Sequence, residues 1–160
     1  DCDTFFVISF REKEVTSVKL IACVDDKMGM MFHRRRQSRD RAVIENIVNM
    51  CGDARLWIAP ESEPLLKETD ASLGIAEDFL NRAGEGEYCL VETWPEQLSE
   101  RFCEEYVETL ILYHWNRSYP ADQFFPLDLQ RWQLNTAEEF AGTSHEHIRK
   151  EIYDKKAEER

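Results

Sequence analysis

One short stretch of this otherwise acidic chain is dominated by arginine. The segment His33–Arg41 holds five arginines and a single aspartate within nine residues. The guanidinium group presents forked N–H donors that bind phosphate and carboxylate groups, and the segment precedes a predicted helix, whose N-terminus favours anions. The alternative is a solvated loop that pairs with the acidic surface. The candidate ligands of an anionic group are Arg34, Arg35, Arg36 and Arg39.

Asp40 is the acidic residue among these arginines, and two interpretations of it stay open. It precedes a run of helical periodicity, where an aspartate can cap the helix by accepting backbone N–H bonds. If it faces a cleft instead, its carboxylate could hold the N–H donors of a planar heterocycle. In that case Asp40 is the candidate catalytic residue.

Three further polar residues could line the same cleft: Tyr113, His114 and Asp122. Tyr113 and His114 belong to a strongly apolar run, where a histidine is either a satisfied core residue or a cleft residue. Asp122 lies between two prolines in the aromatic run 119–126. That run predicts either a rigid loop that leaves a strand or the wall of a ligand cleft.

Histidine is sparse, and its spacing does not match a metal centre. The four histidines are His33, His114, His145 and His147. His145 and His147 would share one face of an extended segment, but two ligands do not make a metal site, and H-E-x-x-H is absent from the sequence. Nor does the sequence contain G-x-S-x-G, a Walker A motif or G-x-G-x-x-G. We expect no metal, and structural or surface roles for these histidines.

Composition narrows the classes of partner. The 160 residues carry a formal charge of −12, from 20 basic and 32 acidic residues, so the field of the whole protein repels nucleic acid. No run of about 18 apolar residues exists, so no segment is expected to span a membrane. The 5 cysteines show no C-x-x-C spacing, which argues against a disulfide framework and favours the cytoplasm. A protein partner or a homo-oligomer stays open.

Apolar runs and helical periodicity alternate along the chain. Strands are predicted over 18–24, 55–59, 88–91 and 107–115, and helices over 40–51, 75–83 and 94–105. A turn is expected at Gly29, a brief edge segment over 127–129, and an antiparallel pair over 132–134 and 147–153. This order predicts an α/β fold, a three-layer sandwich around a mostly parallel sheet with an antiparallel C-terminal edge.

The predicted domain covers residues 18–155, after an N-terminal extension over 1–17 and before a charged tail over 156–160. The side chains expected in its core are Leu20, Ala22, Ile44, Ile47, Trp57, Leu90, Phe102, Leu110 and Leu112.

Several segments together resemble the dihydrofolate reductase family. The run 110–126, Leu-Ile-Leu-Tyr-His-Trp-Asn-Arg-Ser-Tyr-Pro-Ala-Asp-Gln-Phe-Phe-Pro, is similar to that family's strand, loop and Gly-Asp-x-x-Phe-Pro segment. The run 18–29 resembles its opening strand, and Asp40 falls where the family keeps its pterin-binding acid. The resemblance spreads over most of 18–155 and implies a dihydrofolate-reductase-like fold.

The departures from the family concern its cofactor site. Pro60-Glu-Ser62 stands where the resemblance predicts a phosphate-binding turn, and Glu92-Thr-Trp94 replaces a Gly-Gly turn that lets backbone approach a dinucleotide. The resemblance also implies that a strand-bearing segment is missing between Pro64 and Ile75, and that Tyr113 replaces a small threonine. NADPH is therefore not expected as a cofactor, and no other cofactor is predicted.

Two functions follow, and neither decides whether the protein is an enzyme. The first is a divergent dihydrofolate-reductase-like protein that binds a small planar or anionic ligand and is not an efficient NADPH-dependent reductase. The alternative is a non-catalytic interaction domain, because residues 76–108 hold ten acidic and two basic residues. The chain also looks like small proteins that carry a ribonuclease Z label, but it lacks that enzyme's metal-binding histidine motif.

Overall fold

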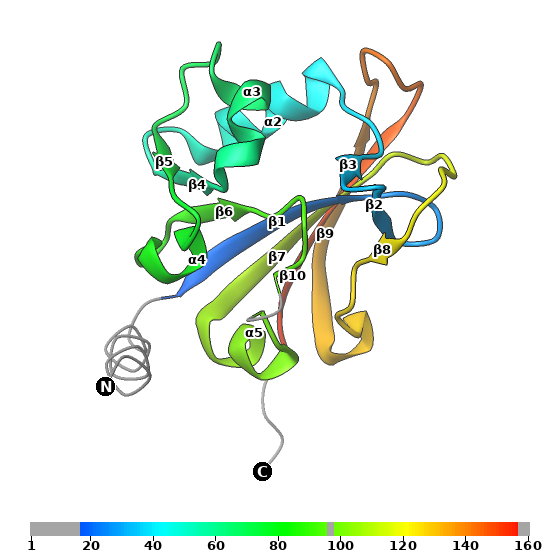
Figure 1. Cartoon of the computed structure of the whole chain (residues 1–160). Helices are drawn as coiled ribbons and strands as arrows, with labels where there is room; N and C mark the ends of the chain where they lie inside the picture. Colours follow the sequence, from blue (N-terminus) through cyan, green and yellow to red (C-terminus); the bar gives the residue numbers. More distant parts are fainter. Residues whose placement is uncertain (1–16, 96–97, 157–160) are drawn as a thin grey trace.

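The apolar strand β1 (Val18–Val24) lies inside a seven-stranded sheet in the computed structural model, which describes residues 17–95 and 98–156. The strand order is β5-β4-β6-β1-β7-β10-β9 (Figure 1). The other strands are β4 (Leu56–Ile58), β5 (Leu73–Ile75), β6 (Tyr88–Leu90), β7 (Val107–His114), β9 (Trp132–Phe140) and β10 (Ile148–Lys155). From β5 through β4, β6 and β1 to β7, neighbouring strands of the sheet are parallel. Strand β10 runs antiparallel to both β7 and β9. The predicted sheet, with its antiparallel C-terminal edge, is confirmed.

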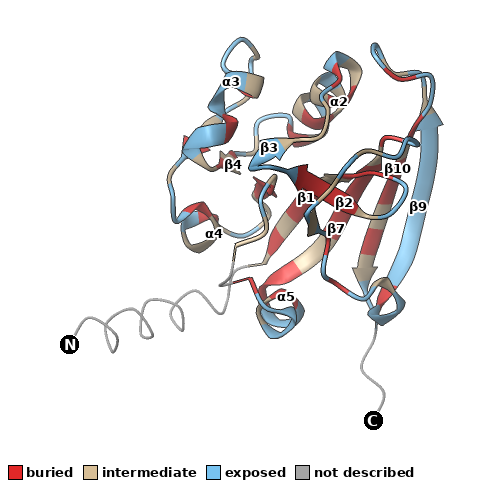
Figure 2. Ribbon diagram, turned by 45° about the vertical axis from the view of Figure 1, so that its right-hand side comes forward, coloured by how far each residue is buried: buried red, intermediate tan, exposed pale blue. Residues whose placement is uncertain are grey.

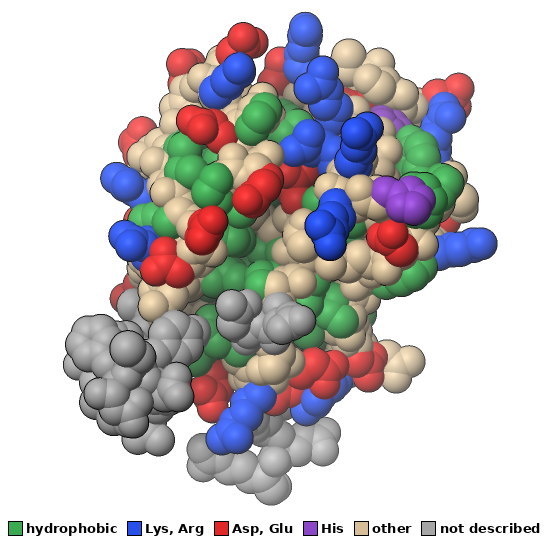
Figure 3. Space-filling model, viewed as in Figure 1, with side chains coloured by type: hydrophobic (Ala, Val, Ile, Leu, Met, Phe, Trp, Pro, Cys, Tyr) green, Lys and Arg blue, Asp and Glu red, His purple; other side chains and the backbone are tan. Residues whose placement is uncertain are grey.

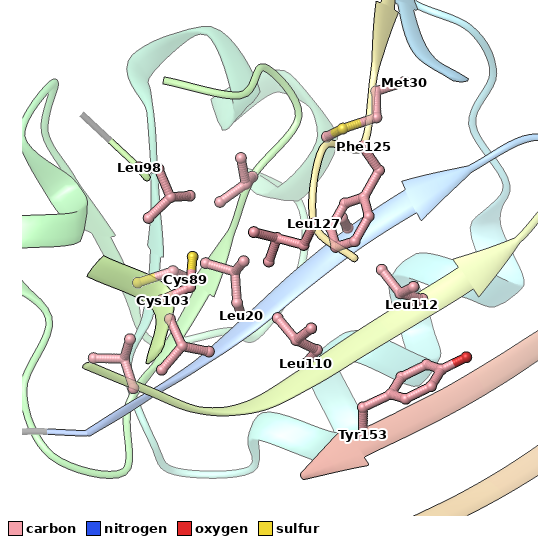
Figure 4. Close-up of a cluster of buried hydrophobic side chains, with 14 of the residues drawn as sticks. Leu20, Met30, Cys89, Leu98, Cys103, Leu110, Leu112, Phe125, Leu127 and Tyr153 are labelled. Atoms are coloured by element: carbon pink, nitrogen blue, oxygen red, sulfur yellow. The ribbon is translucent and has the colours of Figure 1, made fainter. Parts of the chain in front are cut away.

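Alternate side chains of β1 enter two separate cores, one on each face of the sheet. Leu20 belongs to a cluster that includes Leu110, Leu112 and Cys103 of α5 (Glu100–Tyr106), as Figure 4 shows. Ile21 belongs to the other cluster, with buried residues of α2 (Arg41–Cys51) and with Leu66 of α3 (Glu63–Leu66). The period of two along a strand thus gives the sheet its two covered faces. Of the predicted core, Ile44, Trp57 and Phe102 are only partly buried.

A second, smaller sheet was not expected from the sequence. It pairs β2 (Gly29–Phe32) with β3 (Arg35–Arg36) and with β8 (Gln123–Phe124). The prediction of a turn at Gly29 is therefore wrong, because Gly29 opens a strand instead. A side chain there would not fit, since a Cβ on Gly29 would lie 2.6 Å from the Cβ of Ala121. This sheet carries the first arginines of the basic segment.

The short helix predicted over 75–83 is confirmed only in its second half and is wrong at its start. The chain instead forms β5 and, after a turn, the short helix α4 (Phe79–Arg82). The strand that the resemblance implied to be missing before Ile75 is therefore present, at three residues. Gly74 makes it possible, because a Cβ at this position would lie 2.5 Å from the ring of Trp57 on β4.

Two other boundaries differ from the predictions. The helix expected over 94–105 is described only as α5, after the N-cap Ser99, whose side chain accepts the N–H of Phe102; residues 96–97 lie outside the described part. The edge segment expected over 127–129 is not a strand. Asp128 accepts the N–H of Gln130 and caps the 3-10 helix η2 (Leu129–Arg131). A further 3-10 helix, η1 (Pro60–Ser62), leads into α3.

The C-terminal antiparallel pair is confirmed and is longer than predicted. Strand β9 reaches Phe140, and most of its side chains are exposed at the sheet edge (Figure 2). Edge exposure removes the apolar alternation from which a strand is recognised, so only its first residues were predicted.

Residues 1–16 of the predicted extension and 157–160 of the predicted tail lie outside the described residues. Among the described helices, none is long and apolar enough to cross a membrane.

Leu112 provides a test of the sheet's central position. Its side chain is 1% exposed on β7, so we expect Leu112→Ala to lower the free energy of unfolding by about 2–5 kcal/mol in urea titrations. Leu134→Ala on β9 is the control, because Leu134 is 42% exposed and should cost less than about 0.5 kcal/mol. A loss below about 1 kcal/mol at Leu112 would show that β7 is not central.

Candidate functional site

Asp40 is the buried centre around which the candidate site is built. Its backbone is extended, and one carboxylate oxygen, Oδ1, accepts the N–H of Ala42 at 2.9 Å, which makes Asp40 the N-cap of α2. The residue is only 2% exposed. The structure thus shows the capping role, and it adds a burial that a surface cap would not have.

The loop between β9 and β10 closes over the same carboxylate. The backbone N–H groups of Thr143, Ser144 and His145 donate to Asp40 at 2.8, 2.7 and 3.1 Å. Gly142 lets the loop approach, because a Cβ there would lie 2.6 Å from Oδ2 of Asp40. A carboxylate offers about four lone-pair sites, and these donors together with Ala42 and the His145 ring fill them. No acceptor site remains for the N–H groups of a heterocycle.

His145 extends the network from Asp40 to two hydroxyl groups. Its Nδ1 lies 2.9 Å from Oδ2 of Asp40, and its Nε2 lies 3.0 Å from Oγ of Ser38 and 3.0 Å from the hydroxyl of Tyr119. His145 is 4% exposed, and its ring stacks on Trp115 with a centroid distance of 4.7 Å. Sequence reasoning assigned His145 a structural or surface role and did not single out Ser38 as a site residue. The two residues are 107 positions apart, so their spacing gives no local signal.

The electrostatics of the two buried aspartates follow from their donors. Burial alone would raise the pKa of Asp40, but hydrogen bonds from Thr143, His145, Ser144 and Ala42 outweigh it and lower the pKa to about 2. Burial acts in the same way on Asp25, whose pKa is lowered on balance by its own donors, chiefly the N–H groups of Gly29 and Tyr119. Asp25 also accepts from the amide of Gln37, so it fixes both Gln37 and Tyr119 next to the network.

The space beside Asp40 is small. A cavity of about 30 Å³ is lined by Asp40, Ser38, Gln37, Trp115 and apolar residues of β1, α2 and β6. One water molecule occupies about that volume in the liquid, whereas sites for small organic ligands measure about 300–1,000 Å³. The side-chain oxygen Oε1 of Gln37 is buried and has no partner among the described residues. The cavity therefore suits a water molecule or a single functional group.

Glu92 and Arg36 form a second polar cluster next to this cavity. The Nε and Nη2 atoms of Arg36 donate to the two carboxylate oxygens of Glu92 at 2.6 and 3.0 Å, and Ser62 Oγ donates to Glu92 at 2.7 Å. The hydrogen bond to Glu92 raises the pKa of Arg36. This forked pair keeps the Arg36 guanidinium engaged with a carboxylate of the protein itself.

The remaining arginines of the segment stay without a carboxylate partner. Arg34, Arg35, Arg39 and Arg41 form no ion pair with any residue in the described part of the chain. Arg34 and Arg35 line a groove of about 410 Å³ between the β2–β3 hairpin and η1, with Arg36 and Glu92. Figure 3 shows several basic side chains gathered in the upper part of this face, right of its middle, with acidic side chains around them.

Tyr113, His114 and Asp122 do not converge with Asp40 on one cleft. Tyr113 is fully buried beneath α2 and donates its hydroxyl hydrogen to Oδ1 of Asn46. His114 points to the other face of β7, where its Nε2 lies 2.5 Å from Oε1 of Glu151. Asp122 accepts the backbone N–H of His33 and so braces the hairpin. Among the described residues, no group of three or more His, Cys, Asp or Glu side chains is placed to hold a metal.

The buried carboxylate predicts a defined pH dependence of stability. The pKa of Asp40 is lower in the folded than in the unfolded chain, so its contribution is complete above about pH 4 and is lost as the pH falls toward about 2. We expect Asp40→Asn to lower the free energy of unfolding at pH 7 by about 1–3 kcal/mol, because donors are left unmatched.

The difference between wild type and Asp40→Asn should then shrink between pH 4 and pH 2 in urea titrations. Asp53→Asn, at an exposed aspartate just beyond α2, is the control and should show no such convergence. A constant difference across this range would contradict the assignment of the low pKa to Asp40.

Comparison with known proteins supports the fold. No family model matches the sequence, and no curated protein matches it. Among solved structures, a dihydrofolate reductase from Enterococcus faecalis, complexed with NADP(H) and RAB-propyl, superposes with a TM-score of 0.60. The identity is 12%, over 91% of this chain and 98% of the other. This similarity, together with the strand order, shows that the chain has a dihydrofolate-reductase-like fold.

Proposed function

We propose that this protein is a divergent member of its fold class that binds a small anionic ligand through the β2–β3 hairpin and does not act as an efficient NADPH-dependent reductase. The observation that carries the proposal is the pair Arg34 and Arg35, which lack an ion-pair partner among the described residues although the chain carries a charge of −12. In so acidic a protein, unpaired guanidinium groups beside a groove favour a ligand with phosphate or carboxylate groups.

The backbone of the hairpin supports this assignment. His33 and Arg34 form the two-residue turn, and both have positive φ angles, of 49° and 63°. Such turns favour asparagine and glycine, so a histidine and an arginine here store strain of about 1–3 kcal/mol each. Strain of this kind is concentrated at binding sites, and here it lies in the turn that carries Arg34 and precedes Arg35, both of which line the groove.

The cavity at Asp40 argues against a planar heterocycle as the ligand. Its volume of about 30 Å³ is roughly a tenth of the lower limit for small-molecule sites. The carboxylate that would anchor such a ring is already saturated by the β9–β10 loop. The neighbouring groove of about 410 Å³ has room for an anion, and three arginines, Arg34, Arg35 and Arg36, outnumber the two glutamates that also line it, Glu61 and Glu92.

The turn after β6 argues against NADPH. The fold class places a dinucleotide beside this turn, where the chain carries Glu92 in a fork with Arg36 and Ser62. A phosphate group there would meet a carboxylate in place of glycine backbone, and two like charges about 4 Å apart cost about 1–4 kcal/mol. The residues present therefore do not fit this cofactor.

An acidic interaction surface receives less support. The acidic residues of α5 are partly neutralised locally, because Arg131 contacts both Glu100 and Glu104, and Arg101 contacts Glu105. These pairs leave a weaker field than the sequence count suggested.

Anion binding is tested by calorimetry and by thermal shift with inorganic pyrophosphate and citrate. We expect a rise in melting temperature that disappears in Arg34→Gln/Arg35→Gln and weakens with added salt, since the attraction is electrostatic. Arg101→Gln removes an exposed arginine on α5 and is the matched control, which should bind as the wild type does. Equal binding by the hairpin variant, or no shift at millimolar anion, would refute the site.

Cofactor use is tested with NADPH and dihydrofolate at micromolar concentrations. We expect no oxidation of NADPH at 340 nm above the background of the buffer, because the like charge at Glu92 should weaken binding by up to about three orders of magnitude, at about 1.4 kcal/mol per tenfold. Steady turnover that Asp40→Asn abolishes would show instead that the chain is a true reductase.

A further inference from the structure

We propose that Ser38, His145 and Asp40 form a nucleophile–base–acid triad that hydrolyses a small carboxylic ester. The inference is independent of the anion site on the hairpin. It rests on the chain of contacts from Asp40 through both ring nitrogens of His145 to a serine hydroxyl.

The base is held in one orientation. The Asp40 carboxylate accepts from Nδ1 of His145 at 2.9 Å, which places the ring hydrogen on Nδ1 and leaves Nε2 as an acceptor toward Ser38. Stacking on Trp115 fixes the ring plane, and the His145 backbone N–H, which also donates to Asp40, fixes its depth. An imidazole fixed by a buried carboxylate and facing a hydroxyl is the arrangement that activates serine in acyl transfer.

The nucleophile borders on space that a substrate can enter. Ser38 is half-buried and lines the cavity of about 30 Å³, which can take a carbonyl group in place of a water molecule. This cavity shares Arg39, Asp40, Ile44 and Leu65 with an open groove of about 600 Å³. Arg39 and Arg41 line this groove together with Glu45 and Glu68, so its charges balance and a small neutral ester fits it.

The reaction balances without a cofactor. Ser38 Oγ bonds to the ester carbonyl carbon while its proton moves to Nε2 of His145, and Nε2 then returns that proton to the departing alcohol as the C–O bond breaks. Water attacks the acyl-serine, gives a proton to Nε2, and Ser38 takes this proton back as the acid leaves. The sum is ester plus water giving acid plus alcohol. The N–H of Arg39, which has no acceptor among the described residues, is available to the oxyanion.

Tyr119 distinguishes a catalytic network from a purely structural one. Its hydroxyl lies at the same 3.0 Å from Nε2 as Ser38 Oγ does, and a single in-plane lone pair accepts from only one of them. Removing this competitor leaves Nε2 to Ser38. Tyr119→Phe should therefore keep or increase the reactivity of Ser38, although it removes a hydrogen bond from the fold.

The experiment is covalent labelling of the full chain with a fluorophosphonate probe, followed by peptide mass spectrometry. We expect an adduct on Ser38 that is absent in Ser38→Ala, at least about 100-fold slower in His145→Gln, and retained in Tyr119→Phe. Ser72→Ala, at an exposed serine outside the network, is the control and should label as the wild type does. Hydrolysis of phenyl acetate by the wild type, lost in Ser38→Ala, would support an ester substrate.

Rates are divided by the folded fraction from circular dichroism. If His145→Gln does not fold, the adduct on Ser38 of the wild type and its loss in Ser38→Ala still test whether Ser38 is a nucleophile. No Ser38 adduct at millimolar probe, or equal labelling in folded His145→Gln, would overturn the proposal.

Discussion

A carboxylate taken out of water must be surrounded by hydrogen-bond donors, and the candidate site depends on how Asp40 meets this requirement. Its donors come from the first turn of α2, from the loop that joins β9 to β10, and from the ring of His145. Removing a charge from water is expensive unless every lone pair finds a donor. The Asp40 carboxylate therefore fixes the helix start, the C-terminal loop and the orientation of one imidazole together.

The same requirement changes what the fold can bind. Donors that a ligand would otherwise supply come from Thr143 and Ser144, and the space beside the carboxylate is reduced to about 30 Å³. Glu92 acts in a similar way at the neighbouring turn, where it engages Arg36 and Ser62. The polar groups in both places bond to the protein itself, whereas the arginines of the hairpin turn and Arg39 and Arg41 have no ion-pair partner in the part of the chain that the structure describes. On our proposal, Arg34 and Arg35 recognise the anionic ligand, and Ser38 carries out the ester hydrolysis.

The sheet could be predicted from the sequence because its central strands are rich in apolar residues. Val18–Val24 and Val107–His114 are buried on both faces, and such runs are recognisable without any tertiary information. The β2–β3–β8 sheet could not be predicted, since it joins Gly29 to Phe124 across the chain and its strands are two to four residues long. At the site, the position of Asp40 before a helix was enough to predict a cap. The contact between Ser38 and His145 forms because the β9–β10 loop closes over Asp40. No periodic pattern in the sequence predicts the conformation of that loop.

Hydrogen exchange of the loop amides tests most directly whether the Asp40 carboxylate holds the β9–β10 loop. Thr143 and Ser144 are exposed residues, yet their N–H groups donate to a buried carboxylate. Nuclear magnetic resonance at pH 7 should find both amides exchanging roughly tenfold or more slowly than unprotected peptide, with that protection lost in Asp40→Asn, as expected for hydrogen bonds of about 1.5–3 kcal/mol to a charged acceptor. Exchange at the rate of an unstructured loop in the wild type would contradict a carboxylate committed to the protein's own backbone, and would leave Asp40 free for a ligand.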